Sequence, residues 1–449
     1  MNVILGLLSA IVLSLTVGLM GTDGIVASLL TFVFALGVIT IISRNSEEEE
    51  KVFLIQIFVG ALLARLALCV FAFGFNFQEY LASDYLPYEG RGFELYQYWI
   101  GNASITESSK WYLFDTQSVG SAMYYLVAVI YLFTGRNPLA ASLFCGVIGA
   151  ATVPLVYHCT YAIYSNKRVA KTACIAIAFF PAFIVWSSFL LKDGLMMFFL
   201  VITVFSLLRL QKKFNYFDVI AILVSLVVIA GLRFYIFPVL VLGVFSSLII
   251  GTKNTTRSLM SRIVTTVIIG VVLAYFGVAS VVQKNVENYG NFDQLQNSRS
   301  DLAQSGDSGF GRDIDVSTTE GAISALPIGL TYLLLSPFPW QITSLRSALT
   351  LPDTLIWWCS IPLMFIGIYY AAKSKLRENI AILVFVLTLT LLYSIFQGNV
   401  GTAYRQRTQI QVFLFMFIAV GFEVVREKQE NKRLIMNSRK KVYQIKSPV

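Results

Sequence analysis

The stretch SDYLPYEGRGFELYQYW, residues 83–99, combines carboxylates, one arginine and several aromatic rings. Asp84 and Glu89 are candidate proton acceptors, because a carboxylate next to a hydroxyl group can take its proton during group transfer. Tyr88 and Arg91 lie beside them, and aromatic faces with a few charges suit the binding of a sugar. An aromatic belt at a membrane interface would have the same composition, so both interpretations stay open.

Basic residues follow or precede apolar segments at three other places. WSSFLLKDGL contains Lys192 and Asp193, GLRFY contains Arg233, and QGNVGTAYRQR contains Arg405 and Arg407. A guanidinium group matches the spacing of phosphate oxygens, so these sites favour an anionic ligand. A self-compensating Lys–Asp turn and arginines that snorkel from the starts of helices would explain the same residues without a ligand.

The elements that position these residues are membrane-spanning helices. The chain has 449 residues, of which 57% are hydrophobic and only 13% charged, and its mean hydropathy is +0.72. These values exclude a soluble, disordered or disulfide-rich secreted protein and predict an all-α polytopic membrane protein. The net charge is +9, but eight Lys/Arg and two Glu lie after residue 425, so six of those charges belong to one tail. A tail near anionic lipid explains this charge, and no nucleic-acid partner is expected.

Twelve apolar segments are long enough to cross a membrane. They are 2–20, 24–43, 52–75, 138–164, 169–188, 195–211, 216–232, 235–251, 259–282, 354–372, 379–396 and 409–425. The Lys/Arg clusters between them fall on one side only if two shorter segments, 118–134 and 324–337, do not cross. We therefore predict twelve spans, both termini in the cytoplasm, and two half-embedded helices at the outer face.

This topology divides the chain into four parts. Residues 1–282 form an N-terminal transmembrane module whose first outer loop, 75–137, carries the candidate catalytic residues. An outer polar loop (283–323), a C-terminal transmembrane module (324–425) and a basic cytoplasmic tail (426–449) follow. All of the candidate charges then lie at the outer boundary of the membrane, where ionisable groups are costly and usually functional.

The segment from Ser83 to Leu207 resembles the N-terminal half of the GT-C membrane glycosyltransferases, in particular the branch of the protein O-mannosyltransferases and the lipid A aminoarabinose transferase. SAMYYLVAVIYLFTG is similar to the short outer helix of that family. LVYHCTYAIYSNKRVAK is similar to the helix that ends in a basic turn, and FPAFIVWSSFLLKD to the family pattern SPxFIxYSxxxxxD. The resemblance implies a GT-C-like helical bundle in a bacterial inner or plasma membrane.

The resemblance also implies roles for particular residues. Asp84 matches the catalytic acid of the first loop, and Asp193 matches the acid after the SPxFIxYS helix. The family often has Asp-Glu at the first motif, whereas here the next acid is Glu89. The family's lysine before the short outer helix is missing, since Gly120 and Ser121 occupy that place. The phosphate contact would then come from Lys192, Arg91, or the Arg405 and Arg407 pair.

The reaction implied is transfer of a sugar from a polyprenyl-phosphate donor to a lipid, glycan or protein acceptor, with inversion and with Asp84 as general base. No cofactor is expected, and a divalent metal is not required, because no cluster of three carboxylates is visible in the first loop. A lipid-linked glycan polymerase or flippase of a polysaccharide export pathway in the cell envelope would need the same arginines, and is the alternative. A solute transporter fits less well, because its charges would lie deep within paired broken helices.

Overall fold

The computed structural model describes residues 2–102, 104, 106, 110, 120–250, 256–275, 292–304, 308–342 and 344–446. In these ranges the helices are joined by turns and loops, and the one β-bridge among the described residues links Gly309 and Asn399. The elements are α1 (Asn2–Asn45), α2 (Glu48–Gly74), α3 (Gln78–Ala82), α4 (Tyr85–Trp99), α6 (Ser121–Thr134), α7 (Pro138–Tyr164), α8 (Lys167–Phe179), α9 (Pro181–Ser188), α10 (Lys192–Leu210), α11 (Tyr216–Leu232), α12 (Ile236–Ile250), α13 (Thr256–Tyr275), α15 (Phe292–Gln304), α16 (Thr319–Leu335), η1 (Pro339–Gln341), α17 (Leu345–Ala348), α18 (Leu351–Ser374), α19 (Leu376–Phe396) and α20 (Val400–Lys446).

Within the described part of the chain, seven helices are long and apolar enough to cross a membrane, or eight if the bent pair α8 and α9 is one span. The predicted all-α polytopic fold is therefore confirmed. Each of the twelve predicted segments corresponds to a helix or to a bent helix pair. α11 has the predicted bounds and α12 is two residues shorter than predicted, and both, at 17 and 15 residues, are among the shorter apolar helices of the bundle.

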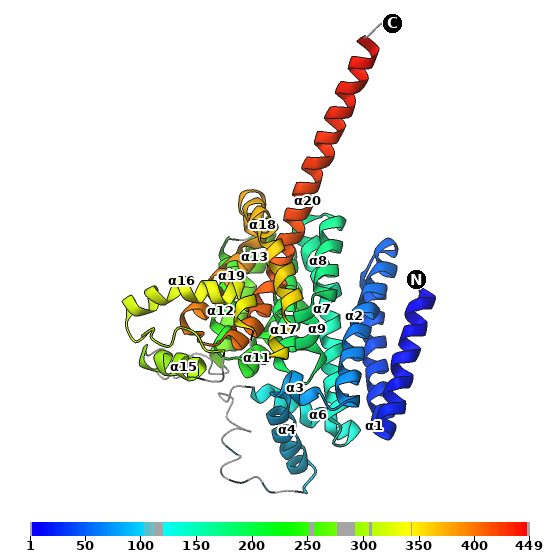
Figure 1. The fold of residues 1–449 in the computed structure, drawn as a ribbon, viewed down its shortest axis with the longest axis vertical. Coiled ribbons are helices and arrows are strands. Elements are labelled where there is room, and N and C mark those ends of the chain that lie inside the picture. The colour runs from blue at the N-terminus through cyan, green and yellow to red at the C-terminus, as the bar shows by residue number, and fades with distance from the viewer. Residues whose placement is uncertain are drawn as a thin grey trace.

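The first helix consists of two halves that pack against each other. The chain reverses direction at Gly21, whose φ of 57° is readily available only to glycine. A Cβ atom at Gly24 would lie 2.2 Å from the carbonyl oxygen of Thr16, so the two halves are in close contact near the turn. These halves are the predicted segments 2–20 and 24–43 (Figure 1).

The two short predicted helices do not cross the bundle. α6 begins beside Gly231, at the end of α11. Shortly after α6 ends, the side chain of Asn137 donates to the carbonyl of Asp23, which lies near the point where α1 reverses direction. α16 lies across the other helices in Figure 1 and packs its Gly329 against the backbone of Ser394. α6 thus has both ends at the same end of the bundle, and α16 lies across the bundle rather than along it, as the distribution of loop charges predicts.

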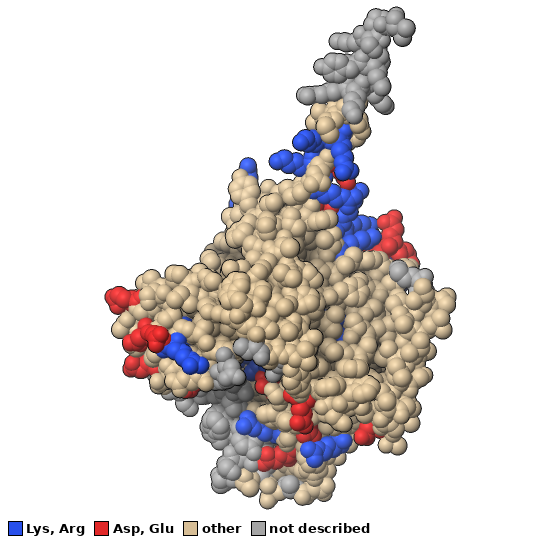
Figure 2. All heavy atoms as spheres, viewed as in Figure 1, with Lys and Arg blue, Asp and Glu red and all other residues tan. Residues whose placement is uncertain are grey.

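The opposite end of the bundle collects the basic loops. Lys167 lies 3.1 Å from Glu49, and Arg168 lies 3.5 Å from Glu423 on α20. In Figure 2, Lys and Arg are concentrated where α20 leaves the bundle. The predicted tail, 426–449, continues α20 without a break and is helical as far as the structure describes it (Figure 1).

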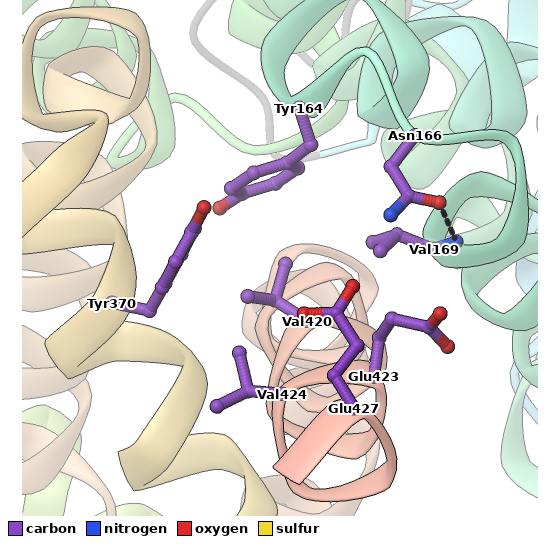
Figure 3. Close-up of a pocket in the computed structure, with 8 residues that line it drawn as sticks. All are labelled: Tyr164, Asn166, Val169, Tyr370, Val420, Glu423, Val424 and Glu427. Atoms are coloured by element: carbon purple, nitrogen blue, oxygen red, sulfur yellow. Dashed lines mark hydrogen bonds between the residues drawn. The ribbon is translucent and has the colours of Figure 1, made fainter. Parts of the chain in front are cut away.

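A cavity of about 60 Å³ lies at this basic end, between α7, α18 and α20 (Figure 3). Tyr164, Tyr370, Glu423 and Glu427 line it. It has room for a few water molecules but not for a sugar. The candidate catalytic residues lie at the other end.

Candidate active site

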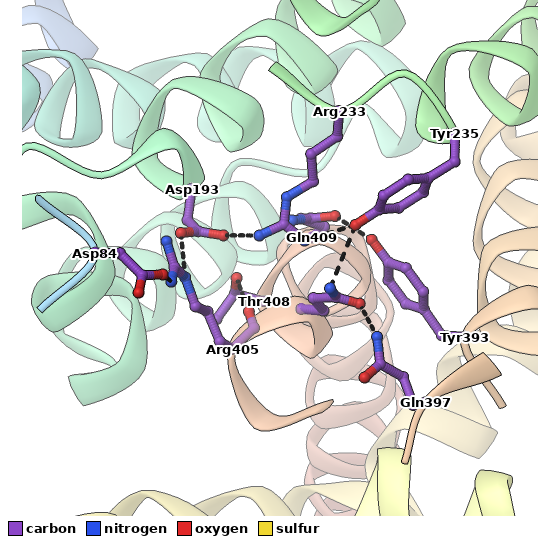
Figure 4. Close-up of polar contacts among 10 residues, drawn as sticks. Asp84, Asp193, Arg233, Tyr235, Tyr393, Gln397, Arg405, Thr408 and Gln409 are labelled. Carbon is purple, nitrogen blue, oxygen red and sulfur yellow. Dashed lines mark hydrogen bonds and ion pairs between the residues drawn. The ribbon is translucent and has the colours of Figure 1, made fainter. Parts of the chain in front are cut away.

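Four segments that are far apart in the sequence meet around Asp193 (Figure 4). Its Oδ1 accepts a hydrogen bond from Nη2 of Arg233 at 2.8 Å, and its Oδ2 accepts one from Nε of Arg405 at 2.5 Å. Nη1 of Arg405 also donates to Asp84. We call Asp84, Lys192, Asp193, Arg233 and Arg405 the charged cluster.

Helix termini place the members of this cluster. Asp84 occupies the N-cap position of α4, and Asp193 lies in the first turn of α10, where the positive end of the helix dipole favours a carboxylate. Arg233 follows the last residue of α11, where the negative end of the dipole favours a cation. Arg405 lies in the second turn of α20.

Burial differs across the cluster. The side chains of Asp193 and Arg233 are 0% and 4% exposed, whereas that of Asp84 is 55% exposed. Asp193 therefore holds two arginines in a site of low dielectric constant, where charge–charge interactions are strong. Asp84 remains accessible from outside the cluster.

The cluster contains three basic and two acidic side chains. The ammonium group of Lys192 lies 5.9 Å from the centre of the Tyr88 ring and has no hydrogen bond or ion pair with any described residue. Nη2 of Arg405 and Nε of Arg233 are buried and have no hydrogen-bond partner among the described residues. These unpaired guanidinium donors give the site the properties of an anion-binding site.

Tyr88 forms one wall of the cluster. Burial raises the pKa of its phenol to about 12, so the hydroxyl stays protonated at neutral pH and can donate a hydrogen bond. Arg91 lies further away: its Nη1 donates to the hydroxyl of Tyr124 at 2.6 Å, and the ring of Tyr124 is 6.2 Å from that of Tyr88. The structure therefore brings Tyr88 to the cluster, whereas Arg91 is separated from Tyr88 by the ring of Tyr124.

Glu89 does not join the cluster. It follows Tyr88 by one residue, which is about 100° around the helix, so its side chain points toward α6. Arg136 donates to both of its oxygens, at 2.8 and 3.0 Å, and the hydroxyl of Tyr131 donates at 3.1 Å. The hydrogen bond to Glu89 raises the pKa of Arg136. In the structure Glu89 braces α4 against α6, which is at odds with the catalytic role predicted for it.

The structure does not bring Arg407 together with Arg405, with which it was predicted to share one anion. Two residues correspond to about 200° around a helix, and α20 begins at Val400 rather than near residue 409, so the two side chains point to opposite sides. Arg407 is completely buried, and its Nη1 donates to the carbonyls of Leu333, Leu334 and Ser336 at 3.3, 3.0 and 2.7 Å. Arg407 therefore caps the C-terminus of α16.

Arg65 also supports the site, although no candidate role was predicted for it. The predicted span 169–188 is bent by 55° between α8 and α9, where Pro181 supplies no backbone N–H. Arg65 is buried within α2 and donates to the hydroxyl of Ser187 at 2.8 Å and to the carbonyl of Ala178 at 3.3 Å. A lone arginine inside an apolar segment was the sequence signal for this role.

Asp353 accepts a hydrogen bond from the start of α9, on the other side of the bend between α8 and α9. One of its oxygens accepts from the backbone N–H of Ala182 at 3.4 Å, and the other accepts from the hydroxyl of Tyr404 at 2.7 Å. A carboxylate at the start of α9 complements the arginine at the end of α8. Together they fix the segment that leads into Lys192 and Asp193.

No group of three or more His, Cys, Asp or Glu side chains in the described ranges is placed to hold a metal ion. The expectation that the reaction requires neither metal nor cofactor stays a prediction.

No family model matches the sequence, and no curated protein matches it. Among solved structures, the chain is similar to the archaeal oligosaccharyltransferase AglB from Archaeoglobus fulgidus, in complex with an inhibitory peptide and a dolichol-phosphate. The TM-score is 0.48 and the sequence identity is 12%, over 87% of this chain and 52% of that one. This chain thus spans about half the length of that protein.

Proposed function

We propose that this chain is a membrane glycosyltransferase that moves a sugar from a polyprenyl-phosphate donor to a lipid, glycan or protein acceptor. The observation that carries the proposal is the charged cluster, in which buried arginines with free donors lie beside an accessible carboxylate. A phosphate-linked lipid suits this place, because its chain stays in the membrane while its phosphate reaches the end of the bundle.

The cations act on the leaving group. The free Nη2 of Arg405 and the ammonium of Lys192 bind the phosphate oxygens without displacing either aspartate. When the bond between the anomeric carbon and the phosphate oxygen breaks, the departing phosphate gains negative charge. Cations that are already in place stabilise that charge at little cost of reorganisation.

Asp84 acts on the acceptor. It takes the proton of the acceptor hydroxyl as the hydroxyl oxygen attacks the anomeric carbon. The phosphate leaves with the electrons of the broken bond, and one displacement inverts the anomeric centre. Arg405 pairs with Asp84. In this proposal Arg405 also binds the phosphate, together with Lys192, so it holds the general base and the leaving group next to each other.

The cluster faces the outside of the membrane in this proposal. The basic loops and the basic tail lie at the opposite end of the bundle, and Lys/Arg-rich loops are retained in the cytoplasm. Both termini are then cytoplasmic.

Binding and transfer test the proposal separately. Purified protein in lipid nanodiscs should bind polyprenyl phosphate, and Arg405→Ala should weaken this binding roughly 10- to 150-fold, the effect of losing one charge-assisted contact. Arg209→Ala is the matched control, because Arg209 lies at the other end of the bundle and pairs with Asp218. Transfer of a radiolabelled sugar from the same lipid then measures the reaction.

The outcomes separate the candidate functions. Equal binding of polyprenyl phosphate by the wild type and Arg405→Ala contradicts the anion site. Binding without any transfer to lipid, glycan or peptide acceptors favours the flippase, which needs the arginines but no base.

A further inference from the structure

A buried polar tract lies directly behind the charged cluster, between α12, α19 and α20. We call Tyr235, Tyr393, Gln397, Gln406 and Gln409 the amide tract (Figure 4). The three glutamines and Tyr393 are buried. Within an apolar bundle such groups are costly unless they are hydrogen-bonded.

The tract is continuous with the cluster. Nη1 of Arg233 donates to the hydroxyl of Tyr235 at 3.1 Å, and Nε2 of Gln406 donates to the same hydroxyl at 3.3 Å. Nε2 of Gln397 donates to Gln406. The hydroxyl of Tyr393 donates to Oε1 of Gln409 at 2.6 Å. Arg233 thus contacts both Asp193 and the tract.

The tract has hydrogen-bonding capacity that the described residues do not use. Oε1 of Gln397, an acceptor, and Nε2 of Gln409, a donor, are buried and have no partner among the described residues. A helix contact that served only stability would be better made with apolar side chains of similar volume. A hydroxyl group of a ligand could satisfy either atom, because a hydroxyl donates and accepts.

We infer that the amide tract is the subsite for the sugar of the donor and that it selects an uncharged sugar. This inference rests on the proposed function. In the donor the sugar is bonded directly to the phosphate, so its subsite has to adjoin the phosphate-binding cations, and Arg233 provides that junction.

The charges of the tract give the selectivity. Its five residues include no carboxylate, so the ammonium group of an amino sugar would lack a counter-ion. For a uronic acid, the cation beside the tract is Arg233, and two of its three nitrogens already donate to Asp193 and Tyr235. A neutral hexose or an N-acetylated hexosamine needs only hydrogen bonds, which amides and phenols provide.

Three lipids of the same chain length test the inference: polyprenyl phosphate, its neutral hexose ester and its amino-hexose ester. The wild-type protein in nanodiscs should bind the neutral hexose lipid more tightly than the bare phosphate, and the amino-hexose lipid no more tightly than the bare phosphate. Gln409→Met should reduce the gain from the hexose about tenfold, the effect of lost hydrogen bonds. It should leave binding of the bare phosphate unchanged.

Gln411→Met is the matched control. Gln411 is a buried glutamine on the same helix, but it lies two residues, or about 200°, from Gln409 and faces away from the tract. The Gln411→Met variant should still bind the neutral hexose lipid more tightly than bare polyprenyl phosphate, by the same factor as the wild type. Gln397→Met provides a second test if Gln409→Met does not fold, because it removes the other unpaired amide of the tract.

The inference is overturned if the wild type gains nothing from the hexose, if it binds the amino-hexose lipid as tightly, or if Gln409→Met and Gln397→Met both keep the gain. Those results leave binding of the bare phosphate, and therefore the proposed function, intact. Failure of the wild type to bind bare polyprenyl phosphate would instead remove the proposed function together with the inference.

Discussion

Asp193 is the carboxylate that Arg233 and Arg405 share, and its replacement by asparagine should destabilise the protein strongly. The substitution keeps the shape of the side chain but removes its charge. Arg233 and Arg405 would then remain buried together with only the half-exposed Asp84 to compensate them. The asparagine also presents an NH₂ group to one of the two arginines, where two donors face each other.

The magnitude follows from the burial of the pair. Removing one partner of a buried ion pair costs about 3–5 kcal/mol, because the remaining charge is left uncompensated. Asp193 is 0% exposed and makes arginine contacts of 2.5 and 2.8 Å, so we expect a loss in this range. Removing Arg233 in the same protein restores the balance of charge. The double variant Asp193→Asn, Arg233→Gln should therefore lose at least about 2 kcal/mol less than the sum of the single variants.

Titration of the reconstituted protein with a denaturing detergent, followed by tryptophan fluorescence, gives the free energy of unfolding of all three variants. The control is the pair of Arg209 and Asp218, which lies at the other end of the bundle at 3.2 Å with its arginine half-exposed. Its loss should change stability by about 0–1 kcal/mol. If the losses of Asp193→Asn and Arg233→Gln simply add in the double variant, the two side chains are not coupled and the electrostatic description of the cluster is wrong.

Three further predictions concern the reaction, the arginine pair and the orientation. Asp84→Asn should keep donor binding and lower turnover about 10²–10⁴-fold, because asparagine cannot accept a proton; unchanged sugar transfer would exclude it as the base. Arg407→Met should lower the free energy of unfolding by about 1–3 kcal/mol without weakening polyprenyl-phosphate binding, because Arg407 caps α16; weaker binding would return it to the anion site. In a Cys359→Ser background, single cysteines at the exposed positions Phe133 and Lys432 should react with an impermeant thiol reagent from opposite sides of the membrane; labelling from one side would refute the orientation.

Much of the fold followed from local sequence. Runs of apolar residues determine spans, because a backbone in lipid has to satisfy its own hydrogen bonds and the helix does so within one segment. The positions of Lys and Arg then predicted which turns share an end of the bundle. That step also identified 118–134 and 324–337 as helices that do not cross, and the contacts of α6 and α16 agree. Asp193, Arg233 and Arg405 were found in the same way, as charges at the ends of apolar segments, and Asp84 was found as a carboxylate of the first outer loop.

The partners of these charges were decided by the tertiary structure. Asp84 and Arg405 are separated by 321 residues, and no local pattern specifies that they meet. Glu89 resembled a second catalytic acid until the fold paired it with Arg136. Arg407 resembled a phosphate ligand until the start of α20 at Val400 fixed its direction. Propensity and hydropathy act over a few residues and set which segments are helical, whereas the direction of a charged side chain and its counter-ion depend on how those helices pack.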